Sequence, residues 1–596
     1  MLRSLSLLAL VTATSSVLAQ HRAETVVVTA SRINENQADV LGAIDVIDRE
    51  QIDRSGSVDV LDLLRAVAGI DIVRGGGLGQ QASVFIRGTN SNHALVLIDG
   101  VRVSALGTGA YAWEHLPIAQ IERIEIVRGP RASLWGADAL GGVLQIFTRR
   151  AEGSDMSLKV GNHDTYGVEA GTGRRGERGG FSARLGWLDS RGQNATRPGN
   201  FSFDPDRDGA MVRNASVAAD LELGQQKLAF SALHTDDEID FDQGVSRTRQ
   251  DVQSLTLSGE LSDHWLHQLV LGAGRDRLDT PAFTTAYRSR RQQADWLHTV
   301  SRGASTATFG LGWLHERGAQ FDTWGAGSTV YQQSRHTSSG FGRWQYRLAQ
   351  HTLEASGRYD DNSVYGGESS LAADWAWDIT SAVRVSASWG EGFRAPTMNE
   401  LFSPGWGGWY AGNPELEAER ARNVELAARL DAESAGAFEL RAFRNTIDQL
   451  IDFSGPQAQA INIARAHVEG VELGWLWQAG AWSVDSNATW QQPRNRDTGE
   501  ALLRRPARKA NLLIERGFDS GLRVGVEATA ASARPDYAGT TLAGYGLLAV
   551  RAYLPLSEAW GLDTRVDNIL NRDYTLVDGY HTPGTTALLS LRWRGD

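Results

Sequence analysis

Hydrophobic and polar residues alternate along most of this chain. From about Asp155 to Asp596, stretches of roughly ten alternating residues are separated by clusters of Gly, Asn and Asp. A period of two predicts a β-strand with one apolar and one polar face. In the segment 481–491, AWSVDSNATWQ, the apolar face carries Trp482, Val484, Ala488 and Trp490, and the polar face carries Ser483, Asp485, Asn487 and Thr489.

The same alternation recurs in segments 305–313 (STATFGLGW) and 585–593 (TTALLSLRW), where aromatic residues again lie at the end of the apolar face. About twenty such segments suit a transmembrane β-barrel of about 22 antiparallel strands, in which aromatic girdles mark both membrane interfaces. A soluble β-sandwich shows the same alternation with fewer strands. The aromatic ends of the segments favour the membrane barrel, which we assign to residues 151–596.

Residues 36–150 have a different pattern and predict a small α+β domain. The segment 57–70, SVDVLDLLRAVAGI, predicts a short amphipathic helix with Ser57 as its N-cap, an apolar face that includes Leu61 and Leu64, and an end at Gly69. Short apolar strands are predicted in ASVFIRG, ALVLIDG, RIEIVRG and GVLQIFT.

The N-terminus has the features of a secretory signal peptide. Residues 1–19 combine Arg3, the apolar run LSLLALV and the small-residue cleavage site Val17-Leu18-Ala19. The mature chain is therefore expected to begin near Gln20. No later apolar run approaches the roughly 18 residues that a transmembrane helix requires.

Composition narrows the classes of function. The chain of 596 residues has no Cys, which excludes disulfide scaffolds, thiolate metal sites and thiol nucleophiles. The net charge of −12 gives no sign of the basic surface that nucleic-acid-binding proteins have. No HExxH, P-loop or GxSxG motif is present, so the sequence predicts neither an enzyme nor a redox cofactor. The 65 Gly and 19 Trp suit a large β-structure with girdles.

A β-branched segment, ETVVVTA, lies close to the predicted mature N-terminus, within residues 20–35. Such a segment suits an extended strand that adds to the sheet edge of a partner protein. An ordinary buried first strand is the alternative. The segment consists of Glu24, Thr25, Val26, Val27, Val28, Thr29 and Ala30.

Two acidic segments suggest a calcium site. FDPDRDG places Asp204, Asp206 and Asp208 at alternate positions, as at the start of a calcium loop, but the twelfth position is Ala215 rather than Glu, which excludes an EF-hand. A second acidic segment, DDEIDFD, lies one hairpin later and includes Asp236, Asp237, Asp240 and Asp242. Two adjacent loops can supply the six to eight oxygens that calcium requires. Solvated acidic loops are the alternative.

Two other motifs allow more than one interpretation. GLGQQA, Gly77 to Ala82, matches a dinucleotide fingerprint, but a strand pattern follows where a phosphate-binding helix is needed, so we interpret it as a Gly-rich loop. WGGWY, with Trp406, Trp409 and Tyr410, suits either stacking on a flat ligand or the outer aromatic girdle.

Several of these segments resemble one known family, the TonB-dependent outer-membrane receptors. ETVVVTA resembles the TonB box, and VFIRGT, LVLIDGVRV and IERIEIVRGPRASLWGADALGGV resemble the plug that fills the barrel lumen. Within the family, DPDRDG, GNPELEAER, VEGVEL, LLRRPA and DNILNRDY are similar to segments of the cobalamin-receptor branch.

The resemblance implies calcium ligands at Asp206 and Asp208, with Asp236, Asp237 and Asp242 as further ligands and Asp204, Asn194 and Asp240 as additional candidates. It also implies that the plug loops near residues 79–81 and 104–113 face the ligand. The predicted ligand contacts are Gln80, Gln81, Ser104, Tyr111, Trp113, Trp406, Trp409 and Tyr410.

The resemblance and the pattern together predict a monomeric barrel in outer-membrane lipid, with an N-terminal plug inside the lumen. The predicted activity is uptake of cobalamin or a similar bulky ligand, energised by TonB of the inner-membrane complex. A ferric siderophore or haem receptor is the alternative within the family. A barrel-anchored secreted enzyme or adhesin is the alternative from another class.

Overall fold

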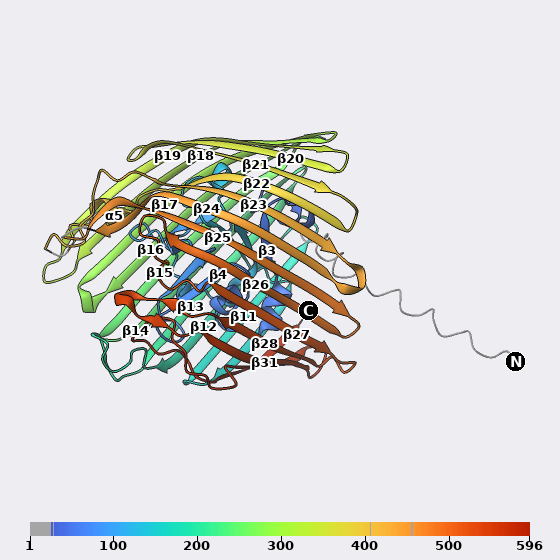
Figure 1. Cartoon of the computed structure of the whole chain (residues 1–596). Coiled ribbons are helices and arrows are strands. Elements are labelled where there is room, and N and C mark those ends of the chain that lie inside the picture. Colours follow the sequence, from blue (N-terminus) through green and yellow to red (C-terminus); the bar gives the residue numbers. More distant parts are fainter. Residues whose placement is uncertain (1–25, 28, 406, 455–456, 596) are drawn as a thin grey trace.

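A closed antiparallel barrel surrounds the N-terminal domain of the chain in the computed structural model (Figure 1). The structure describes residues 26–27, 29–405, 407–454 and 457–595. The barrel has 22 strands. Its first strand, β10 (Gly153–Gly161), pairs with its last, β33 (Thr586–Gly595), and this pairing closes the wall. The predicted 22-stranded barrel is confirmed, whereas the predicted signal peptide lies outside the described residues.

Each barrel strand pairs with the strands before and after it in the barrel. Between β10 and β33, the wall consists of β11 (Thr165–Gly176), β12 (Gly179–Gln193), β13 (Asp208–Leu223), β14 (Gln226–Phe241), β15 (Gly244–Ser262), β16 (Trp265–Thr280), β17 (Thr285–Arg302), β18 (Ser305–Asp322), β19 (Ser328–Leu348), β20 (His351–Asn362), β21 (Gly366–Asp378), β22 (Val383–Arg394), β23 (Glu419–Asp431), β24 (Ala437–Ser454), β25 (Gln459–Ala479), β26 (Trp482–Asn495), β27 (Arg508–Gly517), β28 (Arg523–Ala531), β31 (Tyr545–Pro555) and β32 (Trp560–Asp567).

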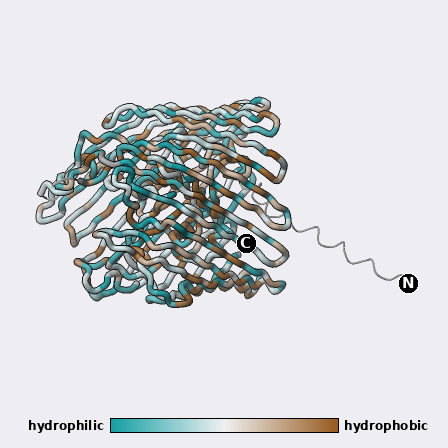
Figure 2. The backbone as a smooth tube through the Cα atoms, in the orientation of Figure 1, coloured by the Kyte–Doolittle hydropathy of each residue, from teal (hydrophilic) through white to brown (hydrophobic). Residues whose placement is uncertain are grey.

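The alternation along each strand sorts side chains between lumen and exterior. On β26, Trp482 and Trp490 are 43% and 48% exposed on the outside, whereas Thr489 is buried against the plug side. On β18, Trp313 is exposed and Thr308 is buried. Hydrophobic and hydrophilic positions accordingly alternate along the wall in Figure 2. The apolar face that the sequence predicts is therefore the outer face of the barrel.

The plug is a mixed domain built on a five-stranded sheet in the order β3-β8-β9-β6-β7. β6 and β9 are parallel, and the other neighbours are antiparallel. A two-stranded sheet, β4 with β5, completes it. The strands are β3 (Ala43–Ile47), β4 (Ile70–Arg74), β5 (Ala82–Ile86), β6 (Ala94–Ile98), β7 (Val101–Arg102), β8 (Ile121–Arg128) and β9 (Gly142–Thr148), and the plug helices are α2 (Arg49–Ser55), α3 (Val60–Arg65) and α4 (Ala132–Trp135).

The helix predicted from residue 57 is present but begins later and is shorter. Asp59 is the N-cap of α3, because its side chain accepts a hydrogen bond from the Leu61 amide at 2.9 Å. The Ser57 hydroxyl instead donates to Asp62 at 2.9 Å. Leu61 and Leu64 are fully buried in the plug core, as predicted.

The Gly-rich segment Gly77–Ala82 is a loop that leads directly into β5, so the loop interpretation is confirmed. Gly79 has a φ of +83°, and a Cβ there would lie only 2.3 Å from the Cβ of Ala210 in the barrel wall. Glycine is required because the loop both adopts a left-handed conformation and touches the wall.

The connections between barrel strands differ in length. The longest of them, residues 395–418, contains α5 (Met398–Phe402), which lies at the opposite end of the barrel from the end of β33 (Figure 1). Within the described part of the chain, no helix is both long and apolar enough to cross a membrane. Short strand pairs lie outside the wall and the plug sheets: β1 (Val26–Val27) with β2 (Glu35–Asn36), and β29 (Arg534–Pro535) with β30 (Thr541–Leu542).

Candidate functional site

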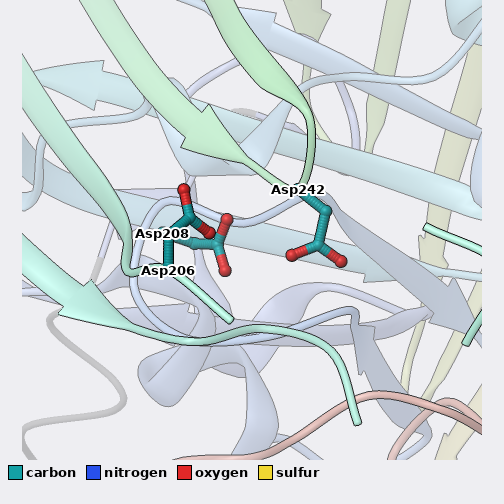
Figure 3. A group of neighbouring side chains, drawn as sticks. All are labelled: Asp206, Asp208 and Asp242. Atoms are coloured by element: carbon teal, nitrogen blue, oxygen red, sulfur yellow. The ribbon is translucent and has the colours of Figure 1, made fainter. Parts of the chain in front are cut away.

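Three carboxylates converge at the outer ends of neighbouring hairpins. One oxygen from each of Asp206, Asp208 and Asp242 lies within 4.8 Å of the others. Asp206 lies in the loop before β13, Asp208 is the first residue of β13, and Asp242 directly follows β14. Figure 3 shows the carboxyl groups directed toward one shared space. The structure thus brings together both acidic segments that the sequence singles out.

The environment of the three carboxylates suits a hard cation. Asp208 is 1% exposed, and one of its oxygens accepts a hydrogen bond from the Ala195 amide at 2.5 Å. The remaining oxygen, Oδ1, is buried without a hydrogen-bond partner, as is Oδ1 of Asp242. Buried carboxylate oxygens need compensation. Calcium, which is bound by clustered carboxylate and carbonyl oxygens, would supply it.

Mutual repulsion in this cluster acts on the pKa of Asp206. Desolvation and the neighbouring carboxylates of Asp204 and Asp242 raise the pKa of Asp206 above its ordinary value. A bound cation would reverse this effect by favouring the ionised form.

Two predicted ligands lie elsewhere. Asp236 and Asp237 are adjacent on β14, so their side chains point to opposite faces of the wall. Asp236 faces outward and forms an ion pair with Arg249 at 2.6 Å. Asp237 faces inward, is 1% exposed and lies 2.9 Å from Nδ1 of His115 on the plug. The expectation that both join the calcium site is therefore corrected.

The additional candidates lie near the three carboxylates, but their carboxylate and amide groups are not part of the converging set. The Asn194 side-chain oxygen accepts a hydrogen bond from the amide of Thr196 at 2.9 Å. Asp240 contributes its main-chain carbonyl, which accepts a hydrogen bond from Nε2 of Gln80 at 2.6 Å. The carboxylates of Asp204 and Asp240 are not among the three that converge.

Sequence reasoning missed the contacts that join plug and wall beside this cluster. Gln80 was expected to contact ligand, yet it is buried and binds the backbone of the acidic hairpin. His115 was not singled out, although it pairs with Asp237. No local signal connects residues so far apart in the chain, because their contact depends on how the plug is seated.

The predicted ligand contacts on the second plug loop are packed side chains. Tyr111 and Trp113 are 4% and 2% exposed, and their rings meet edge to face at 5.0 Å. Both belong to the core shared by the plug and barrel strands. Ser104 is also buried. None of these three side chains offers an open surface to a ligand, whereas Gln81 on the first loop is exposed.

The aromatic residues of the long outer connection are accessible. Trp409 and Tyr410 are 52% and 55% exposed. The Tyr410 ring lies 5.9 Å from that of Phe453, and its amide donates to the Gln457 carbonyl at 3.0 Å. Trp406 lies outside the described residues. The two described rings are therefore open to a flat ligand that approaches from outside.

The segment near the mature N-terminus is paired within the chain. Val26 lies opposite Asn36 and Val27 opposite Glu35, and the Val27 side chain is fully buried. The amide and hydroxyl of Thr29 both donate to Glu125 of the plug, at 2.8 and 2.7 Å. Ala30 is buried, and Glu24, Thr25 and Val28 lie outside the described residues.

Family models match both parts of this architecture. The model described as TonB dependent receptor-like, beta-barrel matches residues 159–569, and the TonB-dependent Receptor Plug Domain model matches residues 36–143. The chain belongs to the TonB-dependent receptors. It is therefore an outer-membrane protein of the Gram-negative type that acts in TonB-dependent transport and is not an enzyme. The family predicted from its motifs is confirmed.

The names of individual relatives mention different ligands. The chain is 29% identical, over 92% of its length and 91% of the relative's, to the vitamin B12 transporter BtuB of Vibrio vulnificus. Among solved structures it resembles the siderophore receptor PirA of Acinetobacter baumannii, with a TM-score of 0.82 and 15% identity over 96% of this chain and 100% of that one. It also resembles a variant of the ferric enterobactin receptor PfeA of Pseudomonas aeruginosa, with a TM-score of 0.80 and 18% identity over the same shares. These two likenesses establish the fold.

Proposed function

We propose that this receptor imports cobalamin or a closely similar corrinoid across the outer membrane. The observation that carries the proposal is the 29% identity to a vitamin B12 transporter, which extends over nine-tenths of both chains. The siderophore receptors that share the fold are less than 20% identical to this chain. Since fold does not determine cargo in such a family, the sequence relationship is the stronger guide.

The chemistry of the outward-facing contacts agrees with a neutral, amide-fringed ligand. Trp409 and Tyr410 present aromatic faces, and Gln81 presents an amide that can donate and accept hydrogen bonds. An anionic ferric siderophore calls for a cationic clamp instead. None of these three exposed side chains is cationic.

Calcium is the second part of the proposal. Asp206, Asp208 and Asp242 would bind the ion, and the ion would hold two outer hairpins together. Ordering these hairpins in advance lowers the entropic cost of binding a bulky ligand. The role of calcium is therefore to pre-organise the outer surface.

Energy coupling is the third part. We infer that residues 24–30 act as the TonB box by adding a strand to TonB. The segment 26–27 is already paired with residues 35–36, so it must be released before it pairs with a partner. The receptor thus exchanges an internal strand pairing for an intermolecular one.

A binding titration tests the substrate. Purified receptor in calcium-containing buffer is titrated with cyanocobalamin, a ferric siderophore and haem. Saturable binding of cyanocobalamin alone is the expected result. Binding of a ferric siderophore without detectable binding of cyanocobalamin would overturn the substrate and leave the family assignment unchanged.

A further inference from the structure

His115 of the plug lies between two acidic side chains. It is the last residue of the short helix η3 (Trp113–His115). Its Nδ1 lies 2.9 Å from Oδ2 of Asp237 on the wall strand β14, and its Nε2 lies 3.9 Å from Oε1 of Glu114 on the plug. The two ring nitrogens therefore face one carboxylate from the wall and one from the plug. This position suits the cationic form of the imidazole, in which both nitrogens carry a proton.

A third carboxylate and a phenol complete this group, which we call the histidine cluster. Asp276 lies on the lumen side of β16, since its neighbours Arg275 and Arg277 are exposed, and its charge acts on His115. The uncharged Tyr111 hydroxyl is buried and lies within range of the same carboxylates. The histidine cluster therefore consists of His115, Asp237, Glu114, Asp276 and Tyr111.

Water has little access to the centre of the histidine cluster. His115 is 6% exposed and Asp237 is 1% exposed. Oδ1 of Asp237 is buried and has no hydrogen-bond partner within the described chain. A buried carboxylate is costly unless a nearby charge or hydrogen bond compensates it. The compensation that the structure offers Asp237 is the adjacent imidazole.

The other charges that act on these carboxylates have partners outside the histidine cluster. They belong to the plug, to both faces of β14 and to β17. The pairs are Arg74 with Asp59, His234 with Asp251 at 2.8 Å, Asp236 with Arg249 at 2.6 Å, Arg288 with Asp279 at 2.6 Å, and Arg291 with Glu316 at 2.8 Å. His115 is therefore the group placed to neutralise Asp237 and Glu114.

The protonation of His115 follows from this arrangement. Burial alone lowers the pKa of a histidine, but the carboxylates of Asp237, Glu114 and Asp276 outweigh burial and raise the pKa of His115 above its ordinary value. The cationic form is thus favoured in the seated plug. Loss of the proton would leave like charges from plug and wall facing each other across a neutral ring.

The wall partner of His115 belongs to the same hairpin as the acidic cluster. Asp237 lies on β14, five residues before Asp242. The first plug loop also contacts this hairpin, through the hydrogen bond from Gln80 to the Asp240 carbonyl. The hairpin is therefore held by both plug loops, and the contact made by the second loop depends on a proton.

We propose that His115 and Asp237 form a pH-sensitive contact that holds the second plug loop against the barrel wall. The contact is complete when His115 carries its proton, below the ordinary histidine pKa of about 6.5. It is lost as the pH rises through the raised pKa of His115, because the carboxylates of Asp237 and Glu114 then repel each other. The contact lies within the described chain, so the proposal does not depend on which ligand the receptor imports.

Hydrogen exchange of the second plug loop tests the contact. Protection of the amides of residues 104–118 is measured on the full-length receptor between about pH 6 and about pH 9, after correction for the intrinsic exchange rate. The wild type is compared with His115→Gln, whose side chain stays neutral at every pH. His234→Gln is the matched control, because His234 lies on the outward face of the same strand and pairs with Asp251.

The wild type and the control are expected to lose protection in this loop by about tenfold or more as the pH rises. His115→Gln should be less protected than the wild type at the lower pH and should show no such loss. The same pH dependence in His115→Gln and the wild type would overturn the proposal. A wild type whose protection does not change with pH would overturn it as well.

A direct measurement of protonation does not depend on the folding of His115→Gln. In receptor labelled with ¹⁵N-histidine, the His115 signal is expected to titrate above the ordinary histidine pKa of about 6.5. In Asp237→Asn, which removes the wall carboxylate and keeps the size of the side chain, the same signal should titrate at a lower pH than in the wild type. A His115 signal that titrates at or below the ordinary value, or that Asp237→Asn leaves unchanged, would contradict the proposal.

Discussion

Arg87 of the plug makes a two-pronged ion pair with Glu472 of barrel strand β25. Nε donates to Oε1 and Nη2 donates to Oε2, both at 2.9 Å. The third nitrogen, Nη1, donates to Glu425 on β23 at 2.6 Å. All three side chains are less than 5% exposed. Buried ion pairs therefore hold the plug against the barrel wall.

Arg87→Met is expected to loosen the plug. The substitution leaves Glu425 and Glu472 buried with fewer partners, and breaking a buried ion pair costs roughly 3–5 kcal/mol. Native-state hydrogen exchange of plug amides measures this loss in local stability. Arg65→Met is the control, because Arg65 pairs with Asp62 at 3.0 Å in a partly exposed i,i+3 contact that contributes about 1 kcal/mol or less. Equal protection of the plug in both variants would contradict the fastening role.

Val27→Pro is expected to abolish uptake and leave ligand binding intact. Proline removes an amide donor and prevents the strand that we propose forms with TonB. Val27→Ile, which keeps the β-branched side chain and the amide, should retain uptake. Uptake by cells is compared with binding to isolated outer membranes, and a parallel loss of both in the proline variant would exclude a role confined to coupling.

Asp206→Asn with Asp208→Asn is expected to weaken cobalamin binding by about tenfold, or about 1.4 kcal/mol, and to remove its dependence on calcium. The wild type should show the same loss when a chelator is added. Asp236→Asn is the matched control, because Asp236 faces outward from the same hairpin toward Arg249. Unchanged affinity in both the double variant and the chelated wild type would identify the acidic loops as solvated surface.

Acid should mimic removal of the ion. The pKa of Asp206 is raised, so its carboxyl group becomes protonated at a higher pH than an ordinary aspartate. Calcium binds the ionised form, and its affinity should therefore fall as the pH decreases through this raised pKa. Calcium titrations at several pH values measure this directly. An affinity that is constant until the pH range of an ordinary aspartate would contradict the prediction.

Two tryptophans should respond differently to truncation. Trp113→Ala is expected to destabilise the plug by roughly 3–5 kcal/mol, because the ring is buried in the core. Trp409→Ala should leave stability unchanged and weaken cobalamin binding by roughly 1–3 kcal/mol. Unfolding and binding are measured on both variants. If the Trp113→Ala variant is stable but binds cobalamin more weakly, the result would support the sequence-based prediction that Trp113 contacts the ligand.

Local pattern was sufficient to predict the barrel but not the seating of the plug. Period-two alternation predicts the strands, so the sequence alone places Trp482 and Trp490 on one apolar face, which is the outer face of the barrel. The N-cap was misplaced by two residues because Ser57 and Asp59 are both good capping residues, and the choice between them depends on hydrogen bonds to Asp62 and Leu61.

The candidate site was predictable only in part. The alternation of strand side chains alone argues against a shared metal for Asp236 and Asp237, since neighbours on a strand face opposite ways. The burial of Trp113 and the pairing of His115 with Asp237 depend instead on packing between segments more than 100 residues apart. The local pattern of one sequence does not show which distant segments pack against each other.

The hydrogen bond from Gln80 to the Asp240 carbonyl couples the position of the plug to the conformation of the outer hairpin. An ion or ligand that orders this hairpin would also stabilise the plug in its present position. By thermodynamic reciprocity, displacement of the plug would weaken the binding of that ion or ligand. If the proposed pull on residues 24–30 displaces the plug, the same movement would weaken ligand binding at the outer surface.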